Sequence, residues 1–292
     1  MQHGRENELI KNMNLSIITI NKNNADGLHI TIESVIAQTY NDFEFIVIDG
    51  ASTDSSIQLL RNLDTRDRRN VSWISEPDRG VFHAMNKGIQ QAKGDYLLFL
   101  NSGDFLVDNH VLQNVFCKCR FSEDILCGSC RITQNGTTIH ITNPPKFFKF
   151  SDFYKTSIAH QSTFIKRTLF DKYGLYREDL KLMSDWEFWI RTIILGKVTT
   201  TNIDVLISDY NLNGISSDTN NQLLKDMEIN QVFTDLNLQK IVIDYQQWES
   251  ERNEMKILSW VKSKTILYYP LCWLYRIAVR MKKNKHNNYA SR

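Results

Sequence analysis

Four short apolar runs in the first hundred residues alternate with stretches in which apolar residues recur at helical spacing. The apolar runs, which have the length of strands covered on both faces, are 15–20, 43–48, 71–74 and 95–100. The stretches with helical spacing are 26–38, 57–63 and 81–92. Repeated strand–helix units form parallel sheets with right-handed crossovers, so the pattern predicts an α/β fold.

The second half of the chain is patterned less regularly and carries no internal repeat or low-complexity linker. It predicts helices at 109–119, 167–173, 186–194 and over most of 220–258, strands at 163–165 and 198–207, and a hairpin over 125–141 that turns at Asn135-Gly136. We therefore expect one α/β domain with a mixed second half of the sheet, not two independent domains.

Composition and charge argue against several classes of protein. The chain has 292 residues, of which 42% are hydrophobic, and a formal net charge of +2. This content excludes wholesale disorder, and the near-neutral balance argues against nucleic-acid binding. The polar first 14 residues lack the apolar segment of a secretory signal, and no apolar run is long enough for a membrane span. We expect a cytoplasmic location.

The five cysteines favour reduced thiols, because an odd number without a signal peptide is typical of the cytoplasm. Cys127 and Cys130 have the C-x-x-C spacing of a zinc or redox site. They lie, however, in a stretch that reads as a strand, which favours small core or edge residues. No metal role is assigned to them.

The tail over 256–292 differs from the rest because it carries no acidic residue. Its lysines and arginines flank the apolar, aromatic stretch 266–279, which Pro270 and Arg276 interrupt. This stretch is too short to span a bilayer but suits the interface with anionic headgroups. We expect peripheral attachment to the inner face of the cell membrane. The alternative is a helix packed on its own domain or on a dimer partner.

Polar residues follow three of the predicted parallel strands at their carboxyl ends. These are 19–21 after the first strand, Asp49 after the second and 101–104 after the fourth. Such ends meet at one edge of an α/β sheet, where ligands bind, although 101–104 alone could be a solvated turn. The absence of G-x-G-x-x-G and of G-x-x-x-x-G-K-[ST] argues against dinucleotide and P-loop sites.

Six segments occur in an order that resembles bacterial family 2 glycosyltransferases of polysaccharide and O-antigen assembly. They are SIITINKNN, VIDGASTD, SEPDRGVFHAMNKGI, GDYLLFLNSGD, HQSTFIKRTLFDKYG and SDWEFWIR. The resemblance covers about 14–216 and implies the GT-A nucleotide-diphospho-sugar transferase fold. It implies an N-terminal extension over 1–13, a glycosyltransferase domain over 14–216 and a helical C-terminal region over 217–292.

The resemblance implies an inverting glycosyltransferase. Its donor would be a nucleotide-diphospho-sugar, usually a UDP-sugar, and its acceptor a hydroxyl of a saccharide. The basic, aromatic tail favours a lipid-linked oligosaccharide as that acceptor. The residues that the family pattern assigns to the nucleotide are Thr19, Asn21, Asp49, Asp78, Arg79, Asn86, Lys87 and Asn101. Thr19 and Asp49 match the positions that hold the nucleobase, and Asp78 and Arg79 lie in the loop that closes over the nucleotide.

The family's metal-binding motif is altered here to Asn101-Ser102-Gly103-Asp104. Asp104 matches its last acid, whereas Gly103 replaces the Asp that usually touches the cation. The resemblance thus implies Mg²⁺ or Mn²⁺, held by Asp104 and mainly by diphosphate oxygens and water, as Mg²⁺ often is.

Asp185 matches the family's catalytic base and opens a predicted helix, where a carboxylate is stabilised as the anion. It could accept the proton of the acceptor hydroxyl; the alternative is a cap that serves only the helix. The positions that the resemblance links to the acceptor or diphosphate are His160, Gln161, Trp186 and Gly214. For His160 the alternative is positioning of a loop, and for Trp186 it is core packing.

Two rival functions fit parts of the pattern. A nucleotidyltransferase also binds a nucleotide at strand ends, but INKNNADG is a poor version of its glycine-rich signature. A catalytically inactive scaffold of a polysaccharide assembly complex is the other rival, because Gly103 stands where an Asp is usual. Release of UDP or of pyrophosphate separates a transferase from a nucleotidyltransferase.

Overall fold

A computed structural model describes most of the chain. The described residues are 15–66, 70–117, 121–134, 136–212, 219–264 and 269–276. The chain divides into two compact units, Met1–Val232 and Phe233–Arg292. No helix within the described ranges is both long and apolar enough to cross a membrane. The boundaries expected after residues 13 and 216 stay predictions, and 1–13 lie outside the described residues.

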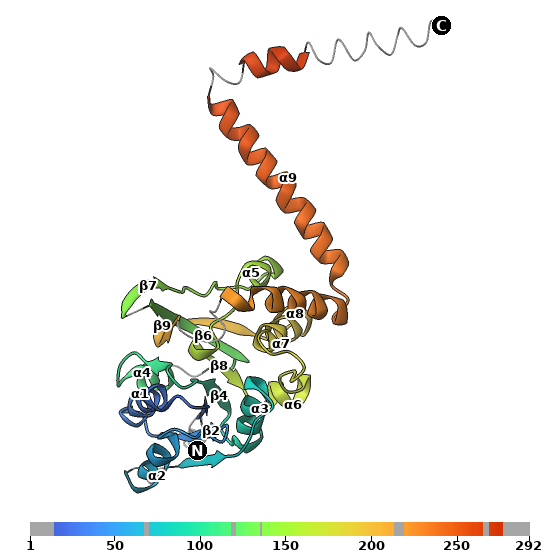
Figure 1. The fold of residues 1–292 in the computed structure, drawn as a ribbon. Coiled ribbons are helices and arrows are strands. Elements are labelled where there is room, and N and C mark those ends of the chain that lie inside the picture. The colour runs from blue at the N-terminus through green and yellow to red at the C-terminus, as the bar shows by residue number, and fades with distance from the viewer. Residues whose placement is uncertain are drawn as a thin grey trace, which may run out of the picture. The chain divides into compact units, whose positions relative to one another are not determined.

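The first half of the sheet is parallel, as the apolar pattern predicts (Figure 1). Its strands are β1 (Leu15–Asn21), β2 (Phe43–Asp49), β3 (Val71–Ser75) and β4 (Tyr96–Phe99). Its helices are α1 (Ala25–Ile36), α2 (Ser56–Arg66) and α3 (Val81–Gln91). Asn21 pairs with Asp49 in register at the carboxyl ends of β1 and β2, so the polar strand ends share one edge.

The second half of the sheet is mixed. Its strands are β5 (Phe105–Leu106), β6 (Ile125–Gln134), β7 (Thr137–Ile141), β8 (Thr163–Lys166) and β9 (Thr200–Asn211). The strand order is β3-β2-β1-β4-β8-β6-β9-β5, with β7 paired to β6. Strand β8 is antiparallel to β4 and to β6, whereas β6 and β9 are parallel. The short β5 pairs with β9 and so closes the far edge of the sheet.

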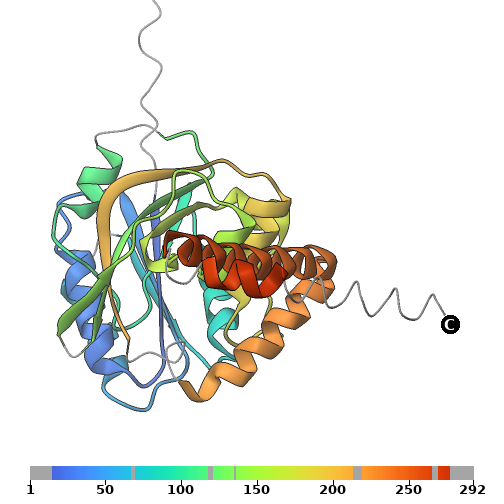
Figure 2. The same cartoon turned by 90° about the horizontal axis from the view of Figure 1, so that it is seen from above.

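Helices cover the central strands on both faces, which explains why β1, β2 and β4 are buried without alternation. Helices α1, α2 and α4 (Val111–Phe116) contribute to one apolar cluster with β1, β2 and β4. On the opposite face lie α3 and α6 (Thr168–Tyr173), where Phe82, Phe99, Phe170, Tyr176 and Phe188 form an aromatic cluster. Figure 2 shows α1, in blue, and α3, in teal, on opposite sides of the strands.

The remaining helices are α5 (Phe150–Lys155), α7 (Ser184–Trp189), α8 (Gln222–Asp235) and α9 (Gln239–Ser263). The other described elements are 3₁₀ turns at His160–Ser162 and Thr219–Asn221, a π-helical turn at Ile190–Leu195 and a helical stretch over 269–276. Helix α8 begins in the first compact unit and runs past its end at Val232.

Several predicted elements differ from the observed ones. The helix expected at 109–119 is the shorter α4, and the helix expected at 186–194 is α7 continued by the π-helical turn. The strand expected at 198–207 continues to Asn211, because β6 on one side and β5 on the other supply hydrogen bonds along it. The hairpin over 125–141 is confirmed as β6 and β7.

Candidate active site

Asp49, at the end of β2, is the centre of a hydrogen-bonded network that joins three strand ends. Its side chain is fully buried and accepts from Asn21 Nδ2 at 2.8 Å, from Ser52 Oγ at 2.6 Å and N at 2.9 Å, and from Ser75 Oγ at 2.7 Å. Burial opposes the charged form, but these hydrogen bonds hold the pKa of Asp49 below its usual 3.8. A buried anion therefore organises this corner of the sheet.

Thr19 and Asn21 on β1 are buried beside this network. Among the described residues, neither Thr19 Oγ1 nor Asn21 Oδ1 has a hydrogen-bond partner. Buried polar atoms usually find partners, so two orphans at one strand end favour a site that a bound molecule completes.

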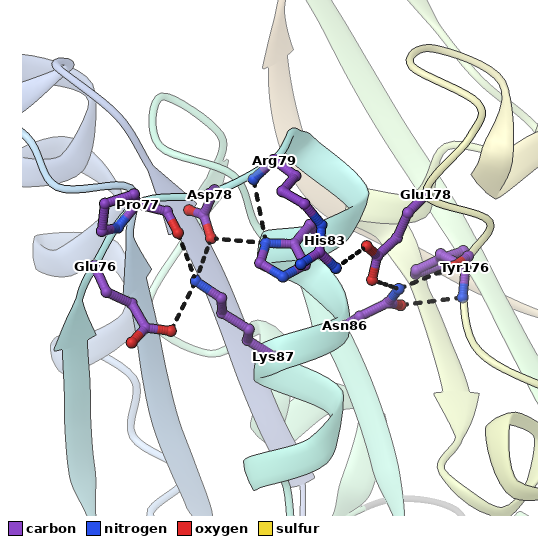
Figure 3. Close-up of polar contacts among 9 residues, drawn as sticks. All are labelled: Glu76, Pro77, Asp78, Arg79, His83, Asn86, Lys87, Tyr176 and Glu178. Atoms are coloured by element: carbon purple, nitrogen blue, oxygen red, sulfur yellow. Dashed lines mark hydrogen bonds and ion pairs between the residues drawn. The ribbon is translucent and has the colours of Figure 1, made fainter.

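Figure 3 shows the loop that follows β3 and its contacts with α3. Lys87 Nζ donates to Asp78 Oδ1 at 2.5 Å and to the Pro77 carbonyl at 3.2 Å, and lies 2.8 Å from Glu76 Oε1. Burial alone would lower the pKa of Lys87, but the two carboxylates raise it. Asp78 also lies against Gly50 at the end of β2, because a Cβ there would meet Asp78 Oδ2 at 3.0 Å. Lys87 thus holds the loop next to the strand ends.

The other half of the contacts in Figure 3 links α3 to the segment after α6. Asn86 is buried, and its amide accepts from Tyr176 N at 3.1 Å and donates to the Tyr176 carbonyl at 2.9 Å. Arg79 pairs with Glu178 at 2.5 Å, yet its side chain is 72% exposed. Asn86 is thus bonded to the backbone of Tyr176, whereas most of the Arg79 side chain is exposed.

The loop at 101–104 is shaped by Thr31 from α1. Thr31 Oγ1 donates to the Asp104 carbonyl at 2.7 Å and accepts from Gly103 N at 3.0 Å. Gly103 has φ +106°, a conformation that L side chains rarely adopt. The glycine that replaces the usual Asp is therefore required by the backbone of this turn.

Asp104 is a buried carboxyl group with little compensation. Its side chain, 6% exposed, accepts from Asn101 N at 3.2 Å. Burial raises the pKa of Asp104 to about 7; the Asp209 carboxylate adds to this, and His160 and the backbone hydrogen bond oppose it. Asp209 itself is satisfied by Arg131 at 2.7 Å and by Thr133 at 2.7 Å. Asp104 is therefore a buried carboxyl group that resists ionisation.

His160 joins the end of β4 to α7. Its Nε2 lies 3.2 Å from Asn101 Nδ2, and its Nδ1 lies 3.1 Å from Asp185 Oδ2. Burial alone would lower the pKa of His160, but the hydrogen bond and charge of Asp185, with the charge of Asp104, raise it above 6.5. The Asn101 NH₂ group donates, so Nε2 accepts from it and the ring proton lies on Nδ1.

Asp185 lies in the first turn of α7, as the sequence predicts for an acid at a helix start. Its Oδ1 accepts from Trp186 N at 2.8 Å, and its side chain is 18% exposed. Glu187, whose role the sequence leaves open, is buried and paired with Arg191 by contacts of 2.8 and 2.9 Å. Of these two acids, Asp185 is the one that can reach a bound molecule.

The remaining predicted positions are placed as follows. Trp186 is 3% exposed and donates from Nε1 to the Phe153 carbonyl at 2.8 Å, which favours core packing over a sugar platform. Gln161 is buried beside His160. Gly214 lies outside the described residues. Cys127 and Cys130 are buried in β6, and burial raises their pKa values to about 12 and about 11, which keeps both thiols protonated.

A divalent cation fits the end of β4. Asp104 is a buried, uncompensated carboxyl, and Asn101 Oδ1 beside it has no partner in the described part of the chain. Both are the oxygen ligands that Mg²⁺ and Mn²⁺ prefer. Within the described ranges, no three His, Cys, Asp or Glu side chains form a metal cluster, so phosphate oxygens or water would complete the coordination.

Sequence reasoning missed several residues that shape the site, namely Thr31, Arg131, Tyr176, Glu178, Asp209 and Glu228. Most are far in sequence from the residues that they hold. Glu228 could have been noticed in the sequence. Leu224, Glu228 and Val232 are spaced four residues apart, as on one face of a helix, and Glu228 is the charged residue between two apolar ones.

Comparison with known protein families gives a match over residues 16–180 to the family described as glycosyl transferase family 2. A PGL/p-HBAD biosynthesis glycosyltransferase of Mycobacterium bovis is 29% identical over 206 residues, which span 70% of this chain and 79% of the relative. An uncharacterized glycosyltransferase of Mycobacterium tuberculosis is 33% identical over 216 residues, or 70% of this chain and 77% of that relative.

Solved structures share the fold at low identity. S. aureus TarS 1–349 in complex with UDP-GlcNAc has a TM-score of 0.56 and 19% identity, with 68% of this chain and 58% of that chain covered. The match thus spans less than two thirds of TarS 1–349. The mannosyltransferase PcManGT from Pyrobaculum calidifontis, in complex with GDP-Man and Mn²⁺, has a TM-score of 0.57 and 15% identity, covering 76% and 63% of the two chains. The expected GT-A fold is confirmed.

Proposed function

Because this chain belongs to glycosyltransferase family 2, we propose that it transfers a sugar from a nucleotide diphosphate to a saccharide hydroxyl with inversion at the anomeric carbon. The donor that we propose is a UDP-sugar, and the acceptor is a lipid-linked oligosaccharide of cell-surface polysaccharide assembly. One observation carries the proposal. The contacts from Asn101 through His160 to Asp185 bring a carboxylate to the strand end where the donor would bind.

Asp185 acts as the general base in this proposal. It accepts the proton of the acceptor hydroxyl while the hydroxyl oxygen forms a bond to the anomeric carbon. The bond from that carbon to the phosphate oxygen breaks, and its electron pair leaves with the nucleoside diphosphate. Attack opposite the leaving group inverts the configuration. A positioned base of this kind contributes about 10²–10⁴-fold to the rate.

His160 orients that base. An ionised Asp185 can only accept, so His160 Nδ1 donates the hydrogen bond of 3.1 Å to Oδ2. On the other side of the ring, Nε2 accepts from Asn101 Nδ2, so the two contacts together fix the orientation of the imidazole. Each oxygen of Asp185 accepts one of its two hydrogen bonds, so each keeps a second lone pair for an acceptor hydroxyl.

The donor site is formed by strand ends and by the loop of Figure 3. The orphan atoms of Thr19 and Asn21 beside Asp49 support a nucleobase contact there. The exposed Arg79 supports a contact with the diphosphate, next to Asp78. Asp104 and Asn101 would hold a divalent cation, which when bound neutralises charge on the diphosphate leaving group.

A panel of nucleotides tests the proposal. Thermal unfolding with UDP-GlcNAc, UDP-glucose, UDP-galactose and GDP-mannose, each with and without Mn²⁺, should show stabilisation by at least one nucleotide sugar, because a ligand that binds the folded state raises its stability. Slow release of UDP or GDP from that sugar should follow. Stabilisation by a nucleoside triphosphate with release of pyrophosphate would instead favour a nucleotidyltransferase, and no turnover of any donor would favour an inactive scaffold.

We also propose that the basic, aromatic tail attaches the protein to the inner face of the cell membrane. Trp260, Tyr269, Trp273 and Tyr275 are each more than half exposed, and Arg276 lies among them. Exposed aromatic rings beside basic residues suit an anionic lipid interface.

Deletion of 256–292 should abolish sedimentation with vesicles that contain phosphatidylglycerol. Each basic residue near such a surface contributes about 1 kcal/mol, so Gln in place of Lys262, Lys264 and Arg276 in the full chain should weaken binding in a salt-dependent manner. Vesicles of phosphatidylcholine alone serve as the control. Undiminished binding of the deleted protein would contradict the proposal and favour packing of the tail on protein.

A further inference from the structure

Three consecutive backbone N–H groups immediately before α7 point at one buried carboxylate. Glu228 of α8 accepts from Lys181 N at 2.7 Å through Oε1, and from Leu182 N and Met183 N at 3.0 Å each through Oε2. The Glu228 side chain is 4% exposed. Met183 is the residue before α7, and Asp185 follows two positions later.

A carboxylate suits this place better than any neutral side chain of the same length. It accepts hydrogen bonds through both oxygens, and bonds from N–H groups to an anion are shorter and stronger than neutral ones. A glutamine would turn an NH₂ group toward at least one of the three N–H groups. The arrangement therefore favours a negative charge at position 228 and fixes the direction of the backbone N–H groups of residues 181–183.

The stretch that leads into 181–183 is held by α3 and by the loop that precedes this helix. Asn86 binds the backbone of Tyr176 in both directions, and Arg79 pairs with Glu178. Gln231, one turn after Glu228 on α8, donates to Asp179 at 3.0 Å. The chain between α6 and α7 is thus fastened to α3 at its start and to α8 at its end, directly before the proposed base.

We propose that Glu228 is a positioning residue for Asp185, which it sets in place by fixing the backbone that enters α7. The proposal rests on the proposed function, in which Asp185 is the general base. It extends the catalytic machinery to α8 from Asp185, which itself lies just past the family match over residues 16–180. Displacement of a reacting group by about 1 Å can cost about 10²-fold in rate, so a defect here would appear in turnover.

The experiment compares Glu228→Gln with Asp226→Asn in the full-length protein. Asp226 is an exposed acid on the same helix, so its variant controls for loss of charge on α8. The probe is the donor of the panel (UDP-GlcNAc, UDP-glucose, UDP-galactose or GDP-mannose) that stabilises the protein most, in radiolabelled form with Mn²⁺. We expect E228Q to release nucleotide about 10–100-fold more slowly, with donor affinity changed less than about twofold, and D226N to match the native chain.

A double variant separates positioning from a general structural role. If Glu228 acts through Asp185, E228Q should lower the residual turnover of Asp185→Asn by less than about twofold, because residues that act as a unit are not additive. The full loss repeated on that background would overturn the proposal. So would native turnover in a folded E228Q, or a loss of donor affinity that parallels the loss of turnover.

Glu228→Asp covers the case in which E228Q does not fold. This variant keeps the charge but shortens the side chain by one methylene. We expect its turnover to lie below that of the native chain and above that expected for E228Q. A folded E228D with native turnover would overturn the inference. If D185N itself keeps native turnover, the proposed base is wrong; if D185N is inactive while Glu228 variants are native, only the present inference fails.

Discussion

Asp185→Asn is expected to lower turnover by about 10²–10⁴-fold while leaving the fold and the donor affinity unchanged. Asparagine has nearly the same shape, and its one amide oxygen can keep either the hydrogen bond from Trp186 N or the one from His160. It cannot take a proton from an acceptor hydroxyl. The variant therefore removes the proton-accepting carboxylate but keeps the size of the side chain and one of its two hydrogen bonds.

The measurement is the rate of nucleotide release at saturating donor, beside the unfolding temperature and the donor affinity. Asp171→Asn is the matched control, because Asp171 is likewise a first-turn acid of a short helix in the same unit but is 68% exposed and pairs with Arg167. Turnover of D185N within about threefold of the native rate would remove Asp185 from the base position. A parallel fall in both variants would indicate that helix α7 or α6 has lost stability.

Asp104→Asn is expected to make the metal-free protein more stable near neutral pH and to remove its response to divalent cations. The carboxyl titrates near 3.8 when unfolded and about 7 when folded, so between these values the folded state holds a proton that the unfolded state has released. Stability of the native chain therefore falls as the pH rises from about 4 to about 7 and stays low above that. Asparagine cannot ionise, and its variant escapes this loss.

The size of the effect follows from the same values. Each pKa unit corresponds to about 1.4 kcal/mol, so the rise from 3.8 to about 7 sets an upper limit of about 4 kcal/mol on the advantage of D104N at about pH 8. At about pH 4 the two proteins should be nearly equal. Urea unfolding over this range measures the difference.

The response of the Asp104 variants to Mn²⁺ and to the nucleotide sugar tests the proposed cation site. Mn²⁺ should stabilise the native chain, more at about pH 8 than at about pH 5, because it competes with the proton for Asp104. Asp104→Ala and D104N should lose this response and bind the nucleotide sugar more weakly. Activity that is indifferent to EDTA, or equal stabilisation of native chain and D104N by Mn²⁺, would contradict a cation at Asp104.

Much of the fold could be read from local pattern. Strands β1 to β4 and helices α1 to α3 agree with the apolar runs and helical spacings, because each element buries a continuous set of side chains. Strand β5 could not be found in this way. It has two residues, and its partner β9 lies about a hundred positions later, so its existence depends on a pairing and not on its own composition.

The site shows the same division. Asp49 and Asp104 could be read as polar residues at strand ends and Asp185 as an acid at a helix start, whereas His160 was indicated only by the family resemblance. Their contacts were not readable. That Lys87 and Asn86 bind protein groups, that Trp186 is enclosed and that His160 links Asn101 to Asp185 depend on segments far apart in the chain.

The sequence by itself determined the α/β alternation, the shared edge of the strand ends and the residue types available there, because periodicity and turn chemistry act over a few neighbours. Tertiary structure alone decided which of those residues meet. Burial then made Asp104 a hard-to-ionise acid, and a helix beyond the family match placed Glu228 under the backbone that carries Asp185. Desolvation and directed hydrogen bonds arise only when distant segments pack, so a local pattern could mark Glu228 as unusual but could not identify the groups that it binds.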